Sequence, residues 1–203
     1  IENYKVGGLA KYGLDYSSLE KVNPKLVYCS ITGFGQTGPY AQRPGYDFLI
    51  QGMAGLMSVT GEPDSQHGGG PTKVGVAVTD IFTGLYAANA IQGALLERHH
   101  SGMGQYIDLA LLDVQAAVMA NQASNYLIGG QIPGRLGNAH PNIVPYQAFA
   151  TADSHIIITV GNDQQFMRFC QVIEQPQWVD DQRYATNTAR VNNRVTLCGQ
   201  ITK

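Results

Sequence analysis

The sequence predicts an α/β protein, and the prediction depends on three features. Residues 26–31 form an apolar run typical of a buried strand, and the glycine-rich segment GFGQTGP (33–39) follows it directly. A long helical pattern and a second strand come later in the same half of the chain. The last part changes to an α+β pattern. Because ligands bind at the carboxyl ends of strands in an open α/β sheet, we expect Gly33, Phe34 and Gly35 to line a substrate pocket.

The remaining elements of the first half follow from local patterns. Residues 15–22 predict a short helix that stops at the Asn23-Pro24 turn. Residues 46–57 predict a helix with apolar side chains on one side, and the Gly- and Pro-containing residues 60–72 predict a loop.

The strongest helical pattern runs from Thr79 or Asp80 to about His99, and Ser101-Gly102 ends it. Its many small residues predict tight packing on all sides. Residues 105–110 predict a strand, and residues 111–128 predict one further, mostly apolar helix.

A segment rich in Gly, Pro and Asn divides the chain. We therefore expect a first domain at 1–128, a linker at 129–142 and a second, smaller α+β domain at 143–203. The predicted elements of the second domain are strands at 146–150 and 155–160 and a helix at 163–173.

Composition excludes several classes of protein. The formal net charge of the 203 residues is −2 and no basic stripe is visible, so nucleic acid is not an expected partner. The sequence has no bilayer-spanning apolar run and no signal peptide, so we expect no membrane partner. Three widely spaced cysteines favour a reducing compartment, the cytoplasm or an organelle matrix. Because the chain starts without Met, we expect it to be an excerpt of a longer protein.

The glycine-rich segment also matches a dinucleotide-binding fingerprint, which the next residues rule out. Gly33, Gly35 and Gly38 have the G-x-G-x-x-G spacing after a strand. The fingerprint needs a helix to open at the third glycine, but Pro39 and further prolines follow. A nicotinamide or flavin nucleotide is therefore not expected.

Two aspartates are candidates for chemistry. Asp80 stands at the start of the long helix, where an aspartate can act as an N-cap or as a carboxylate nucleophile. In the second case, backbone N–H groups at the helix start would stabilise an oxyanion. Asp108 alternates with apolar neighbours on a predicted strand, which favours a hydrogen-bonded structural role.

Other polar residues have more ordinary interpretations. Tyr46-Asp47 opens a predicted helix, where Asp47 suits a cap and the Tyr46 phenol suits a hydrogen-bond donor in a pocket. The five histidines show no metal-ligand spacing, so no metal is expected. His140 lies in the linker, from where it could reach a site, although a surface role is the simpler interpretation.

Four strings of the sequence resemble the class III coenzyme A transferase family, the carnitine-CoA-transferase and bile-acid-inducible-protein-F group. They are ENYKVGGLAKYGLDY (2–16), NPKLVYCSITGFGQTGPYAQRPGYDFLIQGMAGLMSVTG (23–61), VAVTDIFTGLYAANAIQGALLERHHSGMGQYIDLALLD (76–113) and GNAHPNIVPYQAF (137–149). The branch that is most similar moves CoA between dicarboxylates such as succinate and glutarate.

The resemblance implies a Rossmann-like large domain and a smaller domain, both partial here, in an intertwined homodimer. It places the nucleophile at Asp80 and the pocket tyrosine and its acidic neighbour at Tyr46 and Asp47. Asn3 and Tyr4 fall where the adenine end of CoA is held, and Lys11 where a basic residue meets the phosphates. CoA is then a substrate, with acyl-CoA and a small carboxylic acid, and no permanently bound cofactor is implied.

Two other functions remain open. A 2-methylacyl-CoA racemase branch of the same family carries histidine in the place of Tyr46, and it needs two acid–base groups on opposite faces of the substrate. Tyr46 therefore disfavours racemisation. A catalytically silent CoA-binding fragment is the alternative outside enzymes. By the resemblance we expect the cytoplasm, or the mitochondrial matrix in a eukaryote.

Overall fold

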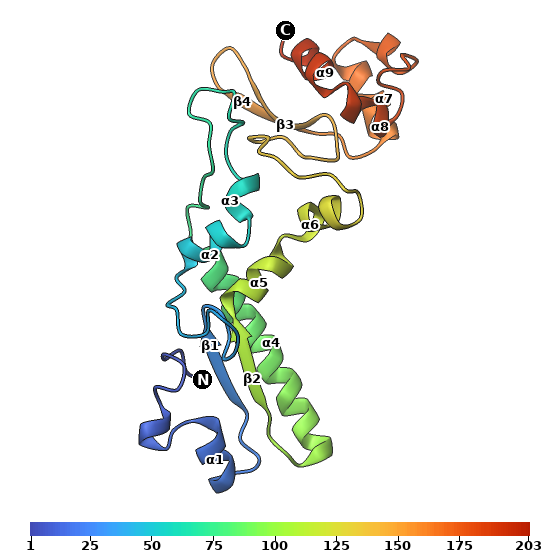
Figure 1. Cartoon of the computed structure of the whole chain (residues 1–203). Coiled ribbons are helices and arrows are strands. Elements are labelled where there is room, and N and C mark those ends of the chain that lie inside the picture. The colour runs from blue at the N-terminus through green and yellow to red at the C-terminus, as the bar shows by residue number, and fades with distance from the viewer. The chain divides into compact units, whose positions relative to one another are not determined.

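The computed structural model describes residues 1–203, which divide into two compact units (Figure 1). The first unit comprises Ile1–Thr60 and Gly70–Arg135, and the second comprises Gly61–Gly69 and Leu136–Lys203. The boundary after Arg135 falls inside the predicted linker, whereas 61–69 joins the second unit although the sequence suggested the first. The domain limits of the whole protein stay a prediction.

A parallel strand pair and its crossover helix form the centre of the first unit. Strand β1 (Tyr28–Thr32) pairs with β2 (Tyr106–Ala110), so that Tyr28 lies opposite Tyr106, and both lie along α4 (Val78–Ser101) (Figure 1). Parallel strands need such a crossover, since a tight turn cannot join them. Glu2 adds a parallel bridge to Ser30 on the other side of β1. The mixed α/β class predicted from the sequence is confirmed.

The flanking helices of the first unit are short. They are η1 (Ala10–Tyr12), α1 (Tyr16–Val22), α2 (Asp47–Met53), α3 (Leu56–Val59), α5 (Leu111–Val118) and α6 (Ala120–Leu127).

Two of the predicted helices are in fact broken. The helix expected at 46–57 divides into α2 and α3 at Gly55, whose φ of 89° leaves the helical region. The helix expected at 111–128 divides into α5 and α6 at Ala120, whose φ is 43°. Since alanine is a strong helix former, the sequence contains no signal for this second break.

Within this chain, α4 does not pack on all sides as its small residues predict. Ala87 and Ala94 are buried, but a Cβ placed on Gly84 or Gly93 would meet nothing within 4 Å. One face of α4 is therefore open. Four large apolar side chains of the helix are exposed: Ile81, Leu85, Tyr86 and Leu96.

The second unit has the α+β pattern that the sequence predicts. Strands β3 (Tyr146–Ala150) and β4 (His155–Thr159) pair antiparallel. The helical elements are α7 (Asp163–Val172), η2 (Pro176–Trp178), α8 (Asn187–Asn192) and α9 (Arg194–Ile201). Their core is made of Val144, Val160, Phe166, Cys170, Tyr184 and Leu197.

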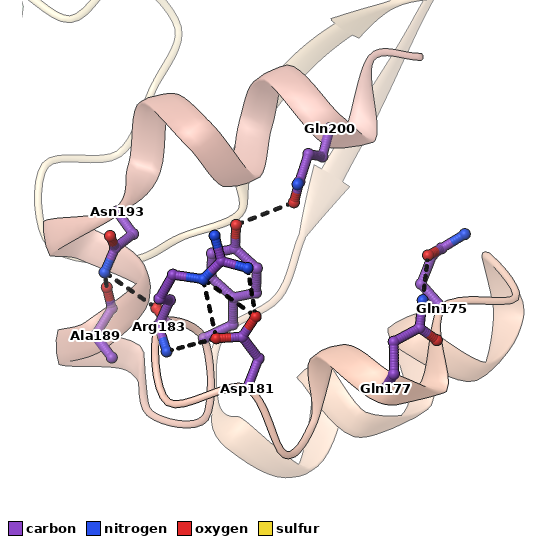
Figure 2. Close-up of polar contacts among 8 residues, drawn as sticks. Gln175, Gln177, Asp181, Arg183, Ala189, Asn193 and Gln200 are labelled. Carbon is purple, nitrogen blue, oxygen red and sulfur yellow. Dashed lines mark hydrogen bonds and ion pairs between the residues drawn. The ribbon is translucent and has the colours of Figure 1, made fainter.

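Polar contacts fasten the helices of this unit to one another. The Tyr184 hydroxyl donates to Gln200 at 3.0 Å, and the Asn193 amide donates to the carbonyls of Ala189 and Arg183 (Figure 2). Beside them, the fully buried Arg190 donates to the carbonyl of Val144 and forms a 2.7 Å ion pair with Asp163. Such a buried cation needs all of these acceptors, because an unpaired buried charge is strongly destabilising.

No helix of the chain is both long enough and apolar enough to cross a membrane. No cluster of three or more His, Cys, Asp or Glu side chains has a geometry that could hold a metal ion.

Candidate active site

Asp80 lies in the first turn of α4, and the helix start is capped by a residue distant in sequence. Ala77, at the local N-cap position, has no side chain that can accept a hydrogen bond. Instead, one carboxylate oxygen of Asp47 accepts from the backbone N–H of Thr79 at 2.8 Å and of Asp80 at 3.3 Å. The Asp47 charge thereby satisfies two of the unpaired donors that every helix start presents.

Buried amides hold this arrangement in place. Gln51 on α2 is fully buried; it donates to the other Asp47 oxygen at 2.6 Å and accepts from the Val74 N–H at 2.9 Å. On the opposite side, the Thr79 hydroxyl donates to the fully buried Gln115 of α5 at 2.6 Å. The start of α4 is thus attached to α2 and to α5 by hydrogen bonds, and the one to α5 is buried.

The pKa of Asp80 is raised above its ordinary value. Partial burial is the larger cause, because it disfavours the charged carboxylate, and the negative charge of Asp47 adds to it. A carboxylate whose ionised form is destabilised in this way is a better nucleophile than a well-solvated one, provided that the pH keeps it ionised.

The expected oxyanion donors at the start of α4 are already engaged. The N–H groups of Thr79 and Asp80 point to Asp47, and the N–H of Ile81 donates to the Ala77 carbonyl. The prediction that these helix amides stabilise an oxyanion is therefore wrong for this arrangement, because a carboxylate from α2 occupies them.

The glycine-rich segment after β1 brings the Tyr46 segment to the strand end. Gly33 and Gly45 approach so closely that a Cβ on either would overlap the backbone of the other. The Phe34 ring meets the Tyr40 ring edge-on, with 5.4 Å between centres. The segment that leads to Tyr46 is therefore attached to the C-terminal end of β1 at two points.

A cavity of about 860 Å³ opens at this end of the first unit. Its lining contains Asp80, Tyr46, Asp47 and Gly33, together with Asn3 and Tyr4 at the start of the chain. The sequence analysis selected all six as site residues, and the structure brings them to one cavity.

Three predicted site residues of the first unit lie away from the lining. Phe34 and Gly35 follow the lining residue Gly33 and shape the turn behind it. Lys11 lies with its ammonium 4.8 Å from the centre of the Tyr12 ring, and the cation nearer the start of the chain that does line the cavity is Lys5. The contact of Lys11 with the CoA phosphates stays a prediction.

His140 belongs to the second unit. Its Nδ1 accepts from the Asn142 N–H at 3.1 Å, and its ring centre lies 5.1 Å from that of Tyr146. Its role in a substrate pocket stays a prediction.

Asp108 has the structural role that its strand position suggests. On β2 it accepts a 3.0 Å hydrogen bond from the backbone N–H of Gln36, and it lies beside Gly35. It therefore orders the glycine-rich turn.

Sequence reasoning missed the residues that support the site. Gln51, Gln115 and Thr79 are the clearest, since each is fully buried and each contributes to the Asp47–α4 junction. The only signal in the sequence is a glutamine inside an otherwise apolar helix pattern. Arg43, which also lines the cavity, gave no signal at all.

Known proteins with related sequences support one family. The succinate–glutarate CoA-transferase of Agrobacterium fabrum is 63% identical over 197 residues, which are 97% of this chain and 48% of that protein. The succinyl-CoA:glutarate CoA-transferase of Homo sapiens is 46% identical, over 97% of this chain and 44% of that protein. The chain thus spans about half the length of the curated relatives it matches.

Solved structures of related proteins support the same family. A CAIB/BAIF family protein from Brucella suis superposes with a TM-score of 0.79 at 56% identity, covering 99% of this chain and 52% of that one. The Rv3272 protein from Mycobacterium tuberculosis gives a TM-score of 0.84 at 29% identity, over 99% of this chain and 52% of that one. The model of the family described as CoA-transferase family III matches residues 1–203. The chain therefore belongs to CoA-transferase family III.

Proposed function

We propose that the full protein moves coenzyme A from an acyl-CoA to a free dicarboxylic acid, with Asp80 as the nucleophile. The observation that carries the proposal is the position of the Asp80 carboxylate, which lines an open cavity together with Tyr46 and Asp47. The names of the relatives, which act on succinate and glutarate, support dicarboxylates as the acids.

In the first half-reaction, the Asp80 carboxylate attacks the thioester carbonyl of the donor. The carbon–sulfur bond breaks and leaves CoA thiolate and a mixed anhydride. The thiolate then attacks the aspartyl carbonyl of the anhydride, releases the donor carboxylate and forms an aspartyl-CoA thioester. The covalent route divides one difficult exchange into easier steps.

The second half-reaction reverses these steps with the acceptor. The acceptor carboxylate attacks the aspartyl thioester, and CoA thiolate leaves again. The thiolate attacks the acceptor carbonyl of the new anhydride and regenerates the Asp80 carboxylate. No proton is gained or lost overall.

The residues around Asp80 have separate parts in this proposal. The Tyr46 phenol, which lines the cavity, donates a hydrogen bond to a substrate oxygen. Asn3 and Tyr4 hold the adenine end of CoA, and Lys11 meets its phosphates. Because Asp47 occupies the first helix amides, the oxyanion donors come from elsewhere in the cavity, such as Tyr46.

Assembly and location form part of the same proposal. The two units are portions of a Rossmann-like large domain and a small domain in an intertwined homodimer, and the open apolar face of α4 is consistent with this assembly. All three cysteines are free, which suits a reducing compartment, the cytoplasm or the mitochondrial matrix of a eukaryote.

The nucleophile is tested in the full-length enzyme with Asp80→Ala, which should abolish transfer from succinyl-CoA to glutarate. Asp108→Ala is the matched control and should keep most of the activity, since Asp108 only orders the glycine-rich turn. Trapping the acyl-enzyme with hydroxylamine should modify the peptide that contains Asp80. Label on Asp108 instead would overturn the assignment.

A further inference from the structure

The only arginine that lines the cavity forms no ion pair with a carboxylate. Arg43 lines the same cavity as Asp80 and Tyr46, and it takes part in no ion pair within the chain. Its guanidinium carbon lies over the Tyr40 ring, 4.3 Å from the ring centre. An arginine that faces a cavity without a carboxylate partner is well placed to bind an anion there.

The backbone and an aromatic stack hold this guanidinium in place. The Arg43 N–H donates to the Tyr40 carbonyl at 2.8 Å, and the Tyr40 ring in turn packs edge-on against Phe34. Two residues after Arg43, the backbone of Gly45 lies in close contact with the backbone of Gly33. A guanidinium stacked on an aromatic ring keeps its planar edge free, and that edge matches the two oxygens of a carboxylate.

We propose that Arg43 binds the distal carboxylate of the dicarboxylate substrate, the one that is not joined to CoA. The inference rests on the transfer reaction proposed above. In that reaction each acid, as acceptor or as acyl group, keeps one free carboxylate while the other reacts at Asp80. Arg43 is then the residue that distinguishes dicarboxylic from monocarboxylic acids.

The place of Arg43 in the chain favours the acid over the phosphates of CoA. Arg43 belongs to the segment that continues into Tyr46 and Asp47, and Asp47 accepts from the Asp80 N–H itself. The other cation of the lining, Lys5, directly follows Asn3 and Tyr4, which are proposed to hold the adenine end of CoA. In the proposed complex, Lys5 would therefore lie toward the adenine end of the thioester and Arg43 toward its acyl end.

The test compares two acceptors in the full-length enzyme with succinyl-CoA as donor: glutarate, and butyrate, which lacks the second carboxylate. Arg43→Gln should raise KM for glutarate and lower its kcat/KM about 10- to 100-fold, the usual effect of losing one charge-assisted pair. With butyrate as the acceptor and the same donor, kcat/KM should stay within about 3-fold of the wild type, which also shows that the variant is folded. Arg43→Lys should fall between the two, because it keeps the charge but loses the planar edge.

Arg168→Gln is the matched control, because it removes the same charge from an exposed position on α7. It should leave both acceptors unchanged. An equal loss for glutarate and butyrate in Arg43→Gln, with KM raised for every acyl-CoA, would assign Arg43 to the CoA phosphates and overturn the inference. If Arg43→Gln keeps the wild-type ratio of kcat/KM for glutarate to kcat/KM for butyrate, the inference about Arg43 is wrong, while the proposed transfer reaction is unaffected. A wild-type enzyme that transfers CoA to neither acid would overturn both proposals.

Discussion

At the scale of single residues, the site depends on two carboxylates held close together. Asp47 caps α4 and in doing so places its charge against the amide of Asp80. The capping stabilises the helix start, while partial burial and, to a smaller extent, the negative charge of Asp47 raise the pKa of Asp80. Removing one carboxylate therefore affects both the fold and the titration of the other.

Asp47→Asn should shift the acidic limb of the pH–rate profile. In the proposed mechanism Asp80 must be ionised to attack, so transfer should fall as the pH decreases through its raised pKa. Asparagine still accepts a hydrogen bond but carries no charge, so the Asp80 pKa should decrease and the acidic limb should move to lower pH. The measurement is kcat against pH in the full-length enzyme.

Asp113→Asn is the control for this profile, since Asp113 is an exposed residue on α5. It should leave the limb in place. If the acidic limb also stays at the same pH in Asp47→Asn, the charge of Asp47 does not control the pKa of Asp80.

Tyr46→Phe separates transfer from racemisation. A protonated phenol can donate to a substrate oxygen but cannot readily take an α-proton from carbon. The variant should therefore lose about 1–3 kcal/mol of transition-state stabilisation, or about 5- to 150-fold in kcat/KM, without becoming inactive.

The companion measurement uses 2-methylacyl-CoA in deuterated water. Mass spectrometry should find little exchange of the α-hydrogen by the wild type. Exchange as fast as CoA transfer would make the racemase the better interpretation.

At the scale of elements, α4 depends on its neighbours more than on its own sequence. Its start lacks a local cap, and α2 and α5 provide the hydrogen bonds instead. The junction with α5 contains one buried group without a partner, the amide nitrogen of Gln115. Since an unpaired buried donor costs free energy, this junction is a sensitive point of the fold.

A double-mutant cycle between α4 and α5 tests this junction. Thr79→Val should reduce the free energy of unfolding by about 1–3 kcal/mol, because it leaves the whole Gln115 amide unpaired. Gln115→Leu should cost less, because it also removes the unpaired nitrogen. The double variant should be closer to the wild type than the sum of the single effects. Urea denaturation of the full-length protein measures all three, and strictly additive values would show that the pair does not interact.

At the scale of the whole molecule, large apolar side chains gather on an exposed face of α4. Leu85 on α4 is 60% exposed, and Ile81 and Tyr86 beside it are also open. Exposed apolar patches of this kind mark surfaces that another segment or subunit covers. In the assembly proposed above, the partner subunit would cover this face.

The full-length protein should sediment as a dimer that does not dissociate at nanomolar concentration. Leu85→Asp should shift it toward monomer, because a charge would be placed in the covered face. Val22→Asp at the exposed end of α1 is the control and should leave the dimer intact. A wild-type protein that is a stable and active monomer would contradict the intertwined assembly.

The sequence alone predicted the α/β class, two strands with a glycine-rich turn after the first, the α+β pattern of the last part and the family. These features are local: periodicity, turn residues and short strings are readable without knowing which segments meet. The same local information placed Asp80 at a helix start. The resemblance to the family selected Tyr46, Asn3 and Tyr4, which the structure brings to one cavity.

The tertiary structure alone decided which groups satisfy one another. Asp47 caps a helix 33 residues further along, Gln115 reaches Thr79 across 36 residues, and Arg190 fills the core of the second unit. The helix break at Ala120 is a further feature without a local signal, since alanine favours the helix. The hydrogen bonds among these residues join segments that are distant in sequence, and burial makes them stronger. Local patterns in the sequence predict neither which segments meet nor which contacts are buried.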